Sequence, residues 1–195
     1  MKRLAIAAIV AATTLSGCVA PVGPVEVTRF HAPDVSPLGK GTIAVEPAPG
    51  SDPASLEWQT YSAAVTRQLI LLGYSEAKPG SSGQVALVKL TRRTLEAQGS
   101  NPVSVGLGGS TGTYGSGLGL GIGINLSPKP AAQIATDLSV SIRDRASGAT
   151  LWEGRATFVV SSKSPLATTA LGAPKVSEAL FAGFPGQSGE TIEVK

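Results

Sequence analysis

The sequence has few of the residues on which most enzymatic and metal sites depend. Its 195 residues include one cysteine, one histidine and one methionine, with two Trp, three Tyr and four Phe. A single cysteine excludes an internal disulfide. One cysteine and one histidine also exclude a zinc site of the usual Cys/His type. We therefore expect no metal site and no bound cofactor.

Catalytic groups are equally scarce. A hydrolase needs a nucleophile, a base and an orienting group, and the only histidine, His31, falls in a predicted proline-flanked loop. The acidic residues are dispersed, although Asp137, Asp144 and Glu153 fall on adjoining predicted strands. We expect these carboxylates to pair with nearby arginines across the strands. Those arginines are Arg143, Arg145 and Arg155. The sequence therefore predicts no enzyme.

The first 17 residues have the pattern of a secretory signal peptide. Lys2 and Arg3 precede the apolar run LAIAAIVAATT (4–14), whose 11 residues are too few for a helix that must cross a hydrocarbon core of roughly 30 Å. The tetrad that follows, Leu15-Ser16-Gly17-Cys18, resembles the bacterial lipobox. The resemblance implies that the lipoprotein signal peptidase recognises Leu15, Ser16 and Gly17. The alternative is a plain signal peptide with Cys18 as a free thiol.

The lipobox resemblance implies a covalent anchor. Cys18 would carry diacylglycerol as a thioether and an N-acyl chain, and two or three acyl chains anchor a protein stably. Residue 19 is Val, not the Asp that resembles an inner-membrane retention signal in enteric bacteria. We therefore predict the periplasmic face of the outer membrane.

The net charge gives no reason to expect a nucleic-acid partner. Removal of the leader's two basic residues lowers the formal net charge from +3 to +1. The remaining basic clusters, Arg92-Arg93 and Arg143/Arg145, are short, whereas nucleic-acid interfaces need a basic patch. The chain is also too apolar, at 42% hydrophobic residues, for wholesale disorder.

Residues 25–185 alternate between strand-like and helix-like patterns and predict one α+β domain. Clean alternation of apolar and polar residues predicts strands, and apolar residues at helical spacing after Ser51-Asp52-Pro53 predict a main helix that ends at Gly73. The predicted strands are 25–30, 42–46, 84–96, 134–144 and 151–160, and the predicted helices are 53–72 and 176–181. We expect a mostly antiparallel sheet with both helices packed on one face, after a tether at 18–24 and before a C-terminal tail at 186–195.

Residues 103–126 are rich in glycine. In the second half, glycines alternate with leucine and isoleucine, so that a strand would have aliphatic residues on one face and bare backbone on the other. The glycines are Gly115, Gly117, Gly119, Gly121 and Gly123. Two interpretations are open: a mobile loop, or a hairpin turning near Tyr114-Gly115 whose flat edge is an interaction surface for another backbone or for a lipid surface.

Three segments, taken in order, resemble the domain-of-unknown-function 4136 family of bacterial lipoproteins. They are LILLGYSEA…GQVALVKL (69–90), LSVSIRDRASGATLWEGRA (138–156) and EALFAGFP (178–185). The resemblance implies a small α+β domain on a lipid anchor. It transfers no catalytic residue, because the family has no established activity.

These patterns favour an uncharacterised, non-enzymatic interaction or assembly module of the cell envelope. Its partners would be the membrane, through the lipid, and an envelope protein or a second copy of the chain. The alternative is a carrier of a small apolar ligand in a pocket between helix and sheet. An envelope hydrolase is the third hypothesis.

Overall fold

Two long strands form the centre of the main sheet because their sequences alternate between apolar and polar residues. β7 (Gln133–Asp144) and β8 (Thr150–Ser161) pair antiparallel over their whole length. The β7 residues that point to one face, Leu138, Val140 and Ile142, are fully buried. The turn between the strands contains Gly148 with a φ of +71°, which favours glycine.

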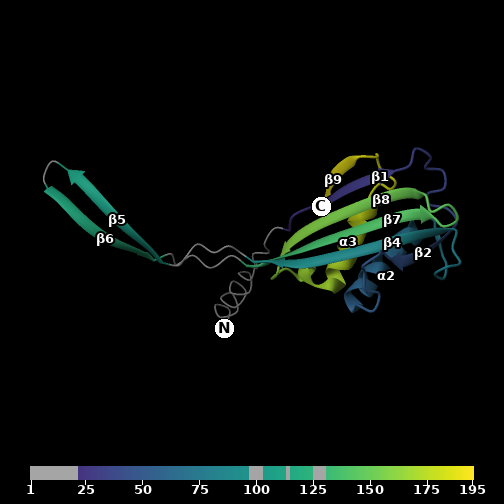
Figure 1. Cartoon of the computed structure of the whole chain (residues 1–195), viewed down its shortest axis with the longest axis horizontal. Coiled ribbons are helices and arrows are strands. Elements are labelled where there is room, and N and C mark those ends of the chain that lie inside the picture. Colours follow the sequence, from purple (N-terminus) through teal and green to yellow (C-terminus); the bar gives the residue numbers. More distant parts are fainter. Residues whose placement is uncertain (1–21, 97–102, 113–114, 125–130) are drawn as a thin grey trace, which may run out of the picture.

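The computed structural model describes residues 22–96, 103–112, 115–124 and 131–195. The main sheet has seven strands in the order β3-β2-β4-β7-β8-β1-β9 (Figure 1). β2 pairs parallel with β3 and β4, and the other neighbours are antiparallel. The remaining strands are β1 (Val25–His31), β2 (Thr42–Pro47), β3 (Ser75–Glu76), β4 (Gln84–Leu95) and β9 (Glu190–Val194). The predicted α+β class with a mostly antiparallel sheet is confirmed.

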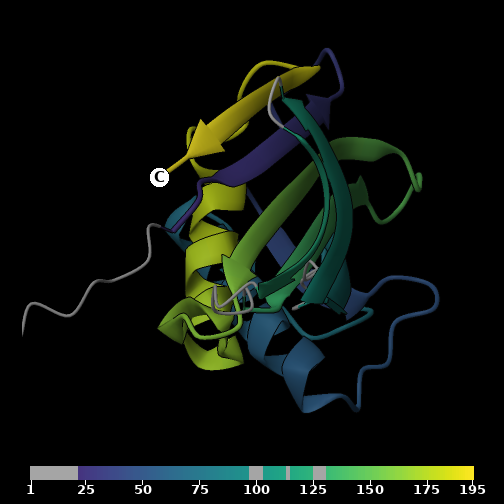
Figure 2. The same cartoon turned by 90° about the vertical axis from the view of Figure 1, so that its left-hand side faces the viewer.

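Two helices cover one face of this sheet (Figures 1 and 2). α2 (Leu56–Leu71) begins after Ser55, whose hydroxyl accepts a hydrogen bond from the Trp58 amide at 3.4 Å, and Gly73 with a φ of +104° follows its end. The helix buries Tyr61 against the sheet. The prediction began this helix three residues too early, because the proline at 53 is followed by a turn before the cap. Among the described residues, no helix is long and apolar enough to cross a membrane.

The second helix is longer than expected. α3 spans Thr169–Phe181, whereas the sequence predicted only 176–181, because Pro174 indicates a helix end. The helix continues through the proline because the residues around it are buried: Gly172, Ala173 and Val176 all pack in the core. Packing of this face compensates for the missing backbone hydrogen bond.

The last strand was not predicted. β9 pairs antiparallel with β1, with Ile192 opposite Val27, whereas the sequence analysis described residues 186–195 as a tail. The strand is only five residues long and only half-buried, so its alternation gives a weak signal. Pairing with β1, the first strand of the domain, holds it in place.

A tryptophan organises the core near α3. The Trp152 ring lies 5.3 Å from the ring centroids of both Phe181 and Phe184, and its indole N–H donates to the Pro185 carbonyl at 3.0 Å. The ring also passes over Gly154, where a Cβ atom would lie 2.2 Å from Trp152 Cη2. Glycine at 154 is therefore what allows the tryptophan to lie against its own strand.

Candidate functional site

The predicted anchor lies outside the described residues. Cys18 and the recognition residues Leu15, Ser16 and Gly17 precede residue 22, where the description of the chain begins. The anchor therefore stays a prediction. β1 begins at Val25, which is fully buried, so only a short segment separates Cys18 from the folded domain.

The glycine-rich segment forms a hairpin rather than a loop. β5 (Val103–Gly112) and β6 (Gly115–Ile124) pair antiparallel over ten residues each. The register pairs glycine or serine of β5 with glycine of β6 at alternate positions. These pairs are Ser104–Gly123, Gly106–Gly121, Gly108–Gly119, Ser110–Gly117 and Gly112–Gly115. All five glycines singled out from the sequence therefore lie on one face of the hairpin.

The other face of the hairpin holds all of its Val, Leu and Ile residues, together with Gly109, Thr111 and Ser116. Here the register pairs Val103 with Ile124, Val105 with Ile122, and Leu107 with Leu120. The hairpin is a sheet of two strands, separate from the seven-stranded one, and within the described part of the chain neither of its outer edges pairs with a further strand. Residues 103–124 contain no charge and no proline, the usual means of protecting an exposed edge.

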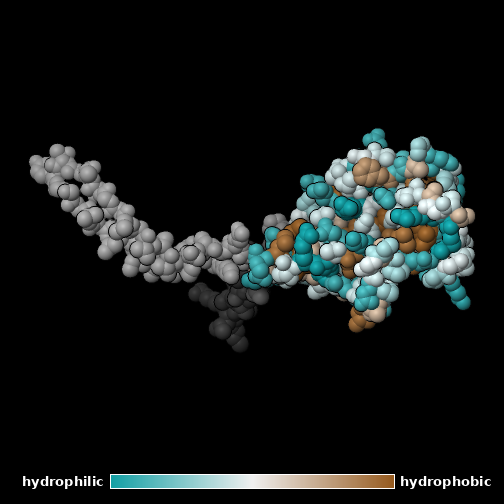
Figure 3. Space-filling model, in the orientation of Figure 1, coloured by the Kyte–Doolittle hydropathy of each residue, from teal (hydrophilic) through white to brown (hydrophobic). Residues whose placement is uncertain are grey.

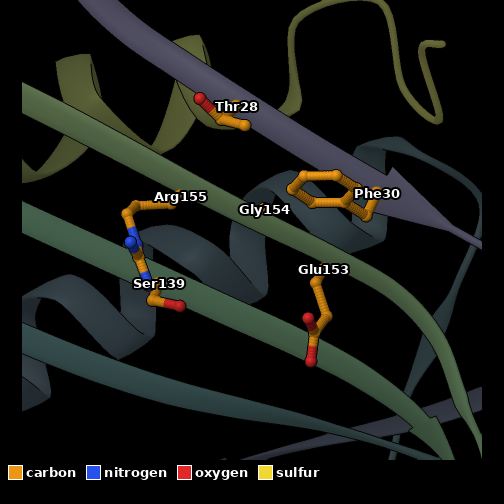
Figure 4. Close-up of a pocket in the computed structure, with 6 residues that line it drawn as sticks. All are labelled: Thr28, Phe30, Ser139, Glu153, Gly154 and Arg155. Atoms are coloured by element: carbon orange, nitrogen blue, oxygen red, sulfur yellow. The ribbon is translucent and has the colours of Figure 1, made fainter. Parts of the chain in front are cut away.

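A second candidate site lies on the face of the main sheet that the helices leave open. Two adjoining depressions, of about 350 and 190 Å³, share Ser139 and Arg155. The register aligns Lys89 of β4, Ser139 of β7, Arg155 of β8 and Thr28 of β1 in one row across the sheet. Figure 4 shows Arg155 extending over Ser139 in the smaller depression. On this face, polar and apolar residues are mixed (Figure 3).

The larger depression carries an excess of positive charge. Three basic residues and one acid line it: Lys89, Arg93, Arg155 and Asp137. Arg93 lies 3.5 Å from Asp137, which also accepts a hydrogen bond from Thr157 at 3.0 Å. Lys89 and Arg155 form no ion pair with any residue that the structure describes. Together with the Ser139 hydroxyl, they can hold a small anion such as a carboxylate or a phosphate.

The open face does not assemble a hydrolytic triad from the described residues. His31 lies at the end of β1, with Nδ1 2.7 Å from the Ala32 carbonyl oxygen, and it lines neither depression. No group of three His, Cys, Asp or Glu side chains among the described residues could hold a metal ion.

The expected pairing of acids with arginines across β7 and β8 was wrong. Asp144 instead accepts hydrogen bonds from the Ser147 amide at 2.8 Å and hydroxyl at 2.6 Å, and the Ser147 bonds hold the Asp144 pKa below its usual value. Glu153 accepts from Ser141 at 3.3 Å. Arg145 pairs with Glu46 of β2 at 2.5 Å. The turn and the neighbouring strands offer these groups closer partners than the opposite strand does.

Sequence analysis also missed a structural role for Arg92. Because β4 alternates, Arg92 falls on the helix-covered face, where it forms an ion pair with Glu57 of α2. It also donates to the Ala167 carbonyl at 2.6 Å and to the Thr136 hydroxyl at 3.2 Å. The alternation of Val88, Leu90 and Arg92 could have indicated this, but the pair Arg92-Arg93 was interpreted only as a basic cluster.

A second missed arginine lies at the end of α3. Arg29 is 2% exposed, and its Nη1 donates to the Ala182 carbonyl at 2.7 Å. A cation at a helix C-terminus is stabilised by the helix dipole. A Cβ atom at Gly186 would lie within 2.3 Å of the Arg29 side chain, so the loop after α3 wraps closely around it. This arginine has a structural role.

Comparison with known proteins supports the fold and leaves the activity open. No protein-family model matches the chain. An uncharacterized protein of Zymomonas mobilis subsp. mobilis is 28% identical over 215 aligned positions, which cover 88% of this chain and 80% of that protein. It is a distant relative with no assigned activity.

Two solved structures are similar at low identity. A PDZ domain protein from Parabacteroides distasonis matches 96% of this chain at 11% identity with a TM-score of 0.50. This chain spans only 42% of that structure. A PelC dodecamer from Paraburkholderia phytofirmans matches 80% of this chain and 96% of its own at 14% identity, with a TM-score of 0.44. At 11% identity, the first of these supports a shared fold and nothing further.

Proposed function

We propose that this chain is a bacterial lipoprotein, anchored through Cys18 on the periplasmic face of the outer membrane. Its domain acts there as a non-enzymatic interaction or assembly module of the cell envelope. The leader and the tetrad Leu15-Ser16-Gly17-Cys18 support the anchor. The resemblance to the domain-of-unknown-function 4136 family of lipoproteins agrees with it.

The observation that carries the interaction function is the hairpin. β5 and β6 present ten-residue edges that no other described strand covers. An isolated hairpin is marginally stable in water, and a bare, uncharged edge is a template for pairing with another chain. An envelope protein or a second copy of this chain can add a strand to either edge.

The other hypotheses have less support. A carrier of a small apolar ligand needs an apolar pocket, whereas the two depressions described on the open face have charged residues in their linings. Side chains such as Tyr61, Val65 and Leu69 fill the region between α2 and the sheet. A hydrolase would need a base close to a nucleophile, and neither depression contains His31.

Metabolic labelling with a radioactive fatty acid tests the anchor. Wild-type protein and Val19→Ala are expected to incorporate the label, and Cys18→Ala is expected to lose it, because only the thiol can form the thioether. Val19→Ala is the matched control, since it changes the next residue and keeps the cysteine. Absence of label on the wild-type protein would contradict the lipoprotein assignment.

Crosslinking in intact cells tests the interaction function. Deletion of residues 104–124 is expected to remove crosslinked species that the wild-type chain forms, while the fatty-acid label is kept. The matched control is Lys78→Ala, which changes an exposed residue in the loop between β3 and β4, outside the hairpin. An unchanged set of crosslinked species after the deletion would exclude the hairpin as the interface.

The open face supports a second candidate function, recognition of a small anion. Lys89 and Arg155 flank Ser139 in one row without an ion-pair partner among the described residues. Titration with inorganic phosphate, followed by NMR, is expected to shift the signals of this row. Lys89→Ala with Arg155→Ala should abolish the shifts, and Arg143→Ala should keep them. Equal shifts in all three proteins would contradict a site here.

A further inference from the structure

Several chain segments leave the domain at the same end. β4 ends at Leu95, which pairs with Gln133 at the start of β7. Gln133 in turn pairs with Ser161 at the end of β8. β1 begins near this point, since Glu26 pairs with Thr157. The start of β1, the end of β4 and the start of β7 therefore lie at one end of the domain (Figure 1). We call this end of the domain the hairpin end.

Exposed hydrophobic residues gather at the hairpin end. Of the nine large hydrophobic residues that are exposed within 22–96 and 131–195, five lie there: Val22 (39% exposed), Leu56 (79%), Leu95 (38%), Val159 (37%) and Leu171 (51%). Leu56 and Leu171 belong to the first turns of α2 and α3, which the hydrogen bond from Thr169 to Glu57 at 3.2 Å joins. Single exposed apolar residues are normal, whereas a gathering of them indicates an interaction surface.

The length of the N-terminal segment limits how far this end can lie from a membrane. Six residues lie between Cys18 and Val25, and a fully extended chain over the seven steps from Cys18 to Val25 spans at most about 25 Å. β4 alone has 12 residues, which span about 40 Å. A lipid on Cys18 therefore holds the hairpin end close to the bilayer, and the opposite end lies farther from it.

The hairpin suits a lipid surface in composition and pattern. No charged residue occurs from residue 97 to residue 128, so no charge has to leave water when the segment meets lipid. The register gathers the aliphatic residues of both strands on one face, as in the pair Leu107–Leu120, and glycine and serine on the other. An element that is apolar on one face and small and polar on the other suits an interface between hydrocarbon and water.

We propose that the hairpin end docks on the lipid bilayer surface, with the aliphatic face of β5 and β6 in the interface. The domain is then attached to the membrane at two points, the acyl chains on Cys18 and the hairpin, and these two points together fix its orientation. This inference rests on the lipid anchor of the proposed function. A second copy of the chain is the competing occupant. The lipid is favoured because the short N-terminal segment brings it to this end.

A fluorescent reporter of depth tests the proposal. The lipidated protein offers no free thiol, so a single introduced cysteine can be labelled with bimane and the protein placed in phosphatidylethanolamine–phosphatidylglycerol vesicles. Reporters at Leu107→Cys and Leu120→Cys sample the aliphatic face. Reporters at Ser104→Cys and Ser110→Cys sample the glycine face, and Glu76→Cys samples the opposite end of the domain.

The expected result is specific to one face. Brominated lipids should quench the fluorescence of the reporters at 107 and 120 at least about twofold more strongly than that of the reporters at 104 and 110. The reporter at 76 should stay unquenched. Circular dichroism of each labelled protein checks that the domain is folded. Use of two positions on each face keeps the result independent of any one variant.

Other outcomes overturn the inference. Equal quenching on both faces, or no quenching in the hairpin, contradicts docking on lipid. A blue shift that grows with protein concentration in the absence of vesicles shows that a second copy covers the face instead. These results are distinct from failure of the proposed function, which would appear as an absence of fatty-acid label on the wild-type chain.

Discussion

The two sheets of this protein follow the same rule of alternation and differ in what covers them. In the seven-stranded sheet, α2 and α3 bury the apolar face, and residues such as Leu138 and Val140 are fully inaccessible. In the hairpin, the aliphatic residues also share one face, but β5 and β6 form a sheet by themselves. Alternation thus predicts strands in both places. The difference between the two apolar faces is that helices pack on one and no described element packs on the other. A covered face contributes to folding, whereas an uncovered one is available for contact with a partner.

The largest effect on stability is expected in the covered sheet. Trp152→Ala removes the ring that packs against Phe181 and Phe184, and a cavity of this size should lower the free energy of unfolding by about 3–5 kcal/mol. Leu120→Ala in the hairpin is the matched change and should stay within about 0.5 kcal/mol. Urea denaturation followed by circular dichroism measures both. Equal losses would remove the distinction between the sheets.

A smaller difference in stability is expected between substitutions on the two faces of the main sheet. Arg92→Met removes the ion pair with Glu57 and the donor to the Thr136 hydroxyl and the Ala167 carbonyl, and should cost about 1–3 kcal/mol. Arg93→Met changes the adjacent residue on the open face, where the side chain is 58% exposed, and should cost less than about 1 kcal/mol. Thermal unfolding of the two variants checks the difference. If Arg93→Met is the more damaging, the assignment of faces is wrong.

A weaker effect depends on pH and lies in the β7–β8 turn. Hydrogen bonds from Ser147 lower the pKa of Asp144 in the folded state. The stabilisation is therefore present above the unfolded pKa of about 3.9 and is lost as the pH falls through the folded value. Asp144→Asn should make the unfolding midpoint less sensitive to pH between about 5 and 2. Identical pH profiles for the wild type and the variant would contradict this linkage.

The smallest effect on folding is expected from removing the hairpin. Because the main sheet is complete without β5 and β6, deletion of residues 104–124 should shift the Tm of the domain by less than about 4 °C. Differential scanning calorimetry measures the shift. A large drop in Tm would show that the hairpin belongs to the folding unit, and would weaken its interpretation as a surface for a partner.

The parts of the fold predictable from sequence are those with local signals. The alternation of 134–144 and 151–160 predicted β7 and β8, and Gly73 marked the end of α2. β9 was missed because its position depends on pairing with β1, some 160 residues away in the chain. The first half of α3 was missed because packing outweighs the preference of Pro174 against helix.

The candidate sites also differ in whether a local sequence pattern identifies them. The five glycines from 115 to 123 were identified from a local pattern, and the structure forms them into one face of a hairpin. The row of Lys89, Ser139 and Arg155 was not predictable, because its members come from three strands whose register is set by the whole sheet. The pairing of Arg145 with Glu46 was missed for the same reason, since 99 residues separate them.

The pairing of β1 with both β8 and β9 has a consequence for how the protein is made. A chain synthesised amino-terminus first delivers β1 before either of its partners, because β8 begins at Thr150 and β9 ends at Val194. Loops this long close slowly. The first strand of the domain therefore waits for the last residues of the chain before both of its edges are paired. Truncation at the C-terminus would remove β9 and leave this edge of the sheet open.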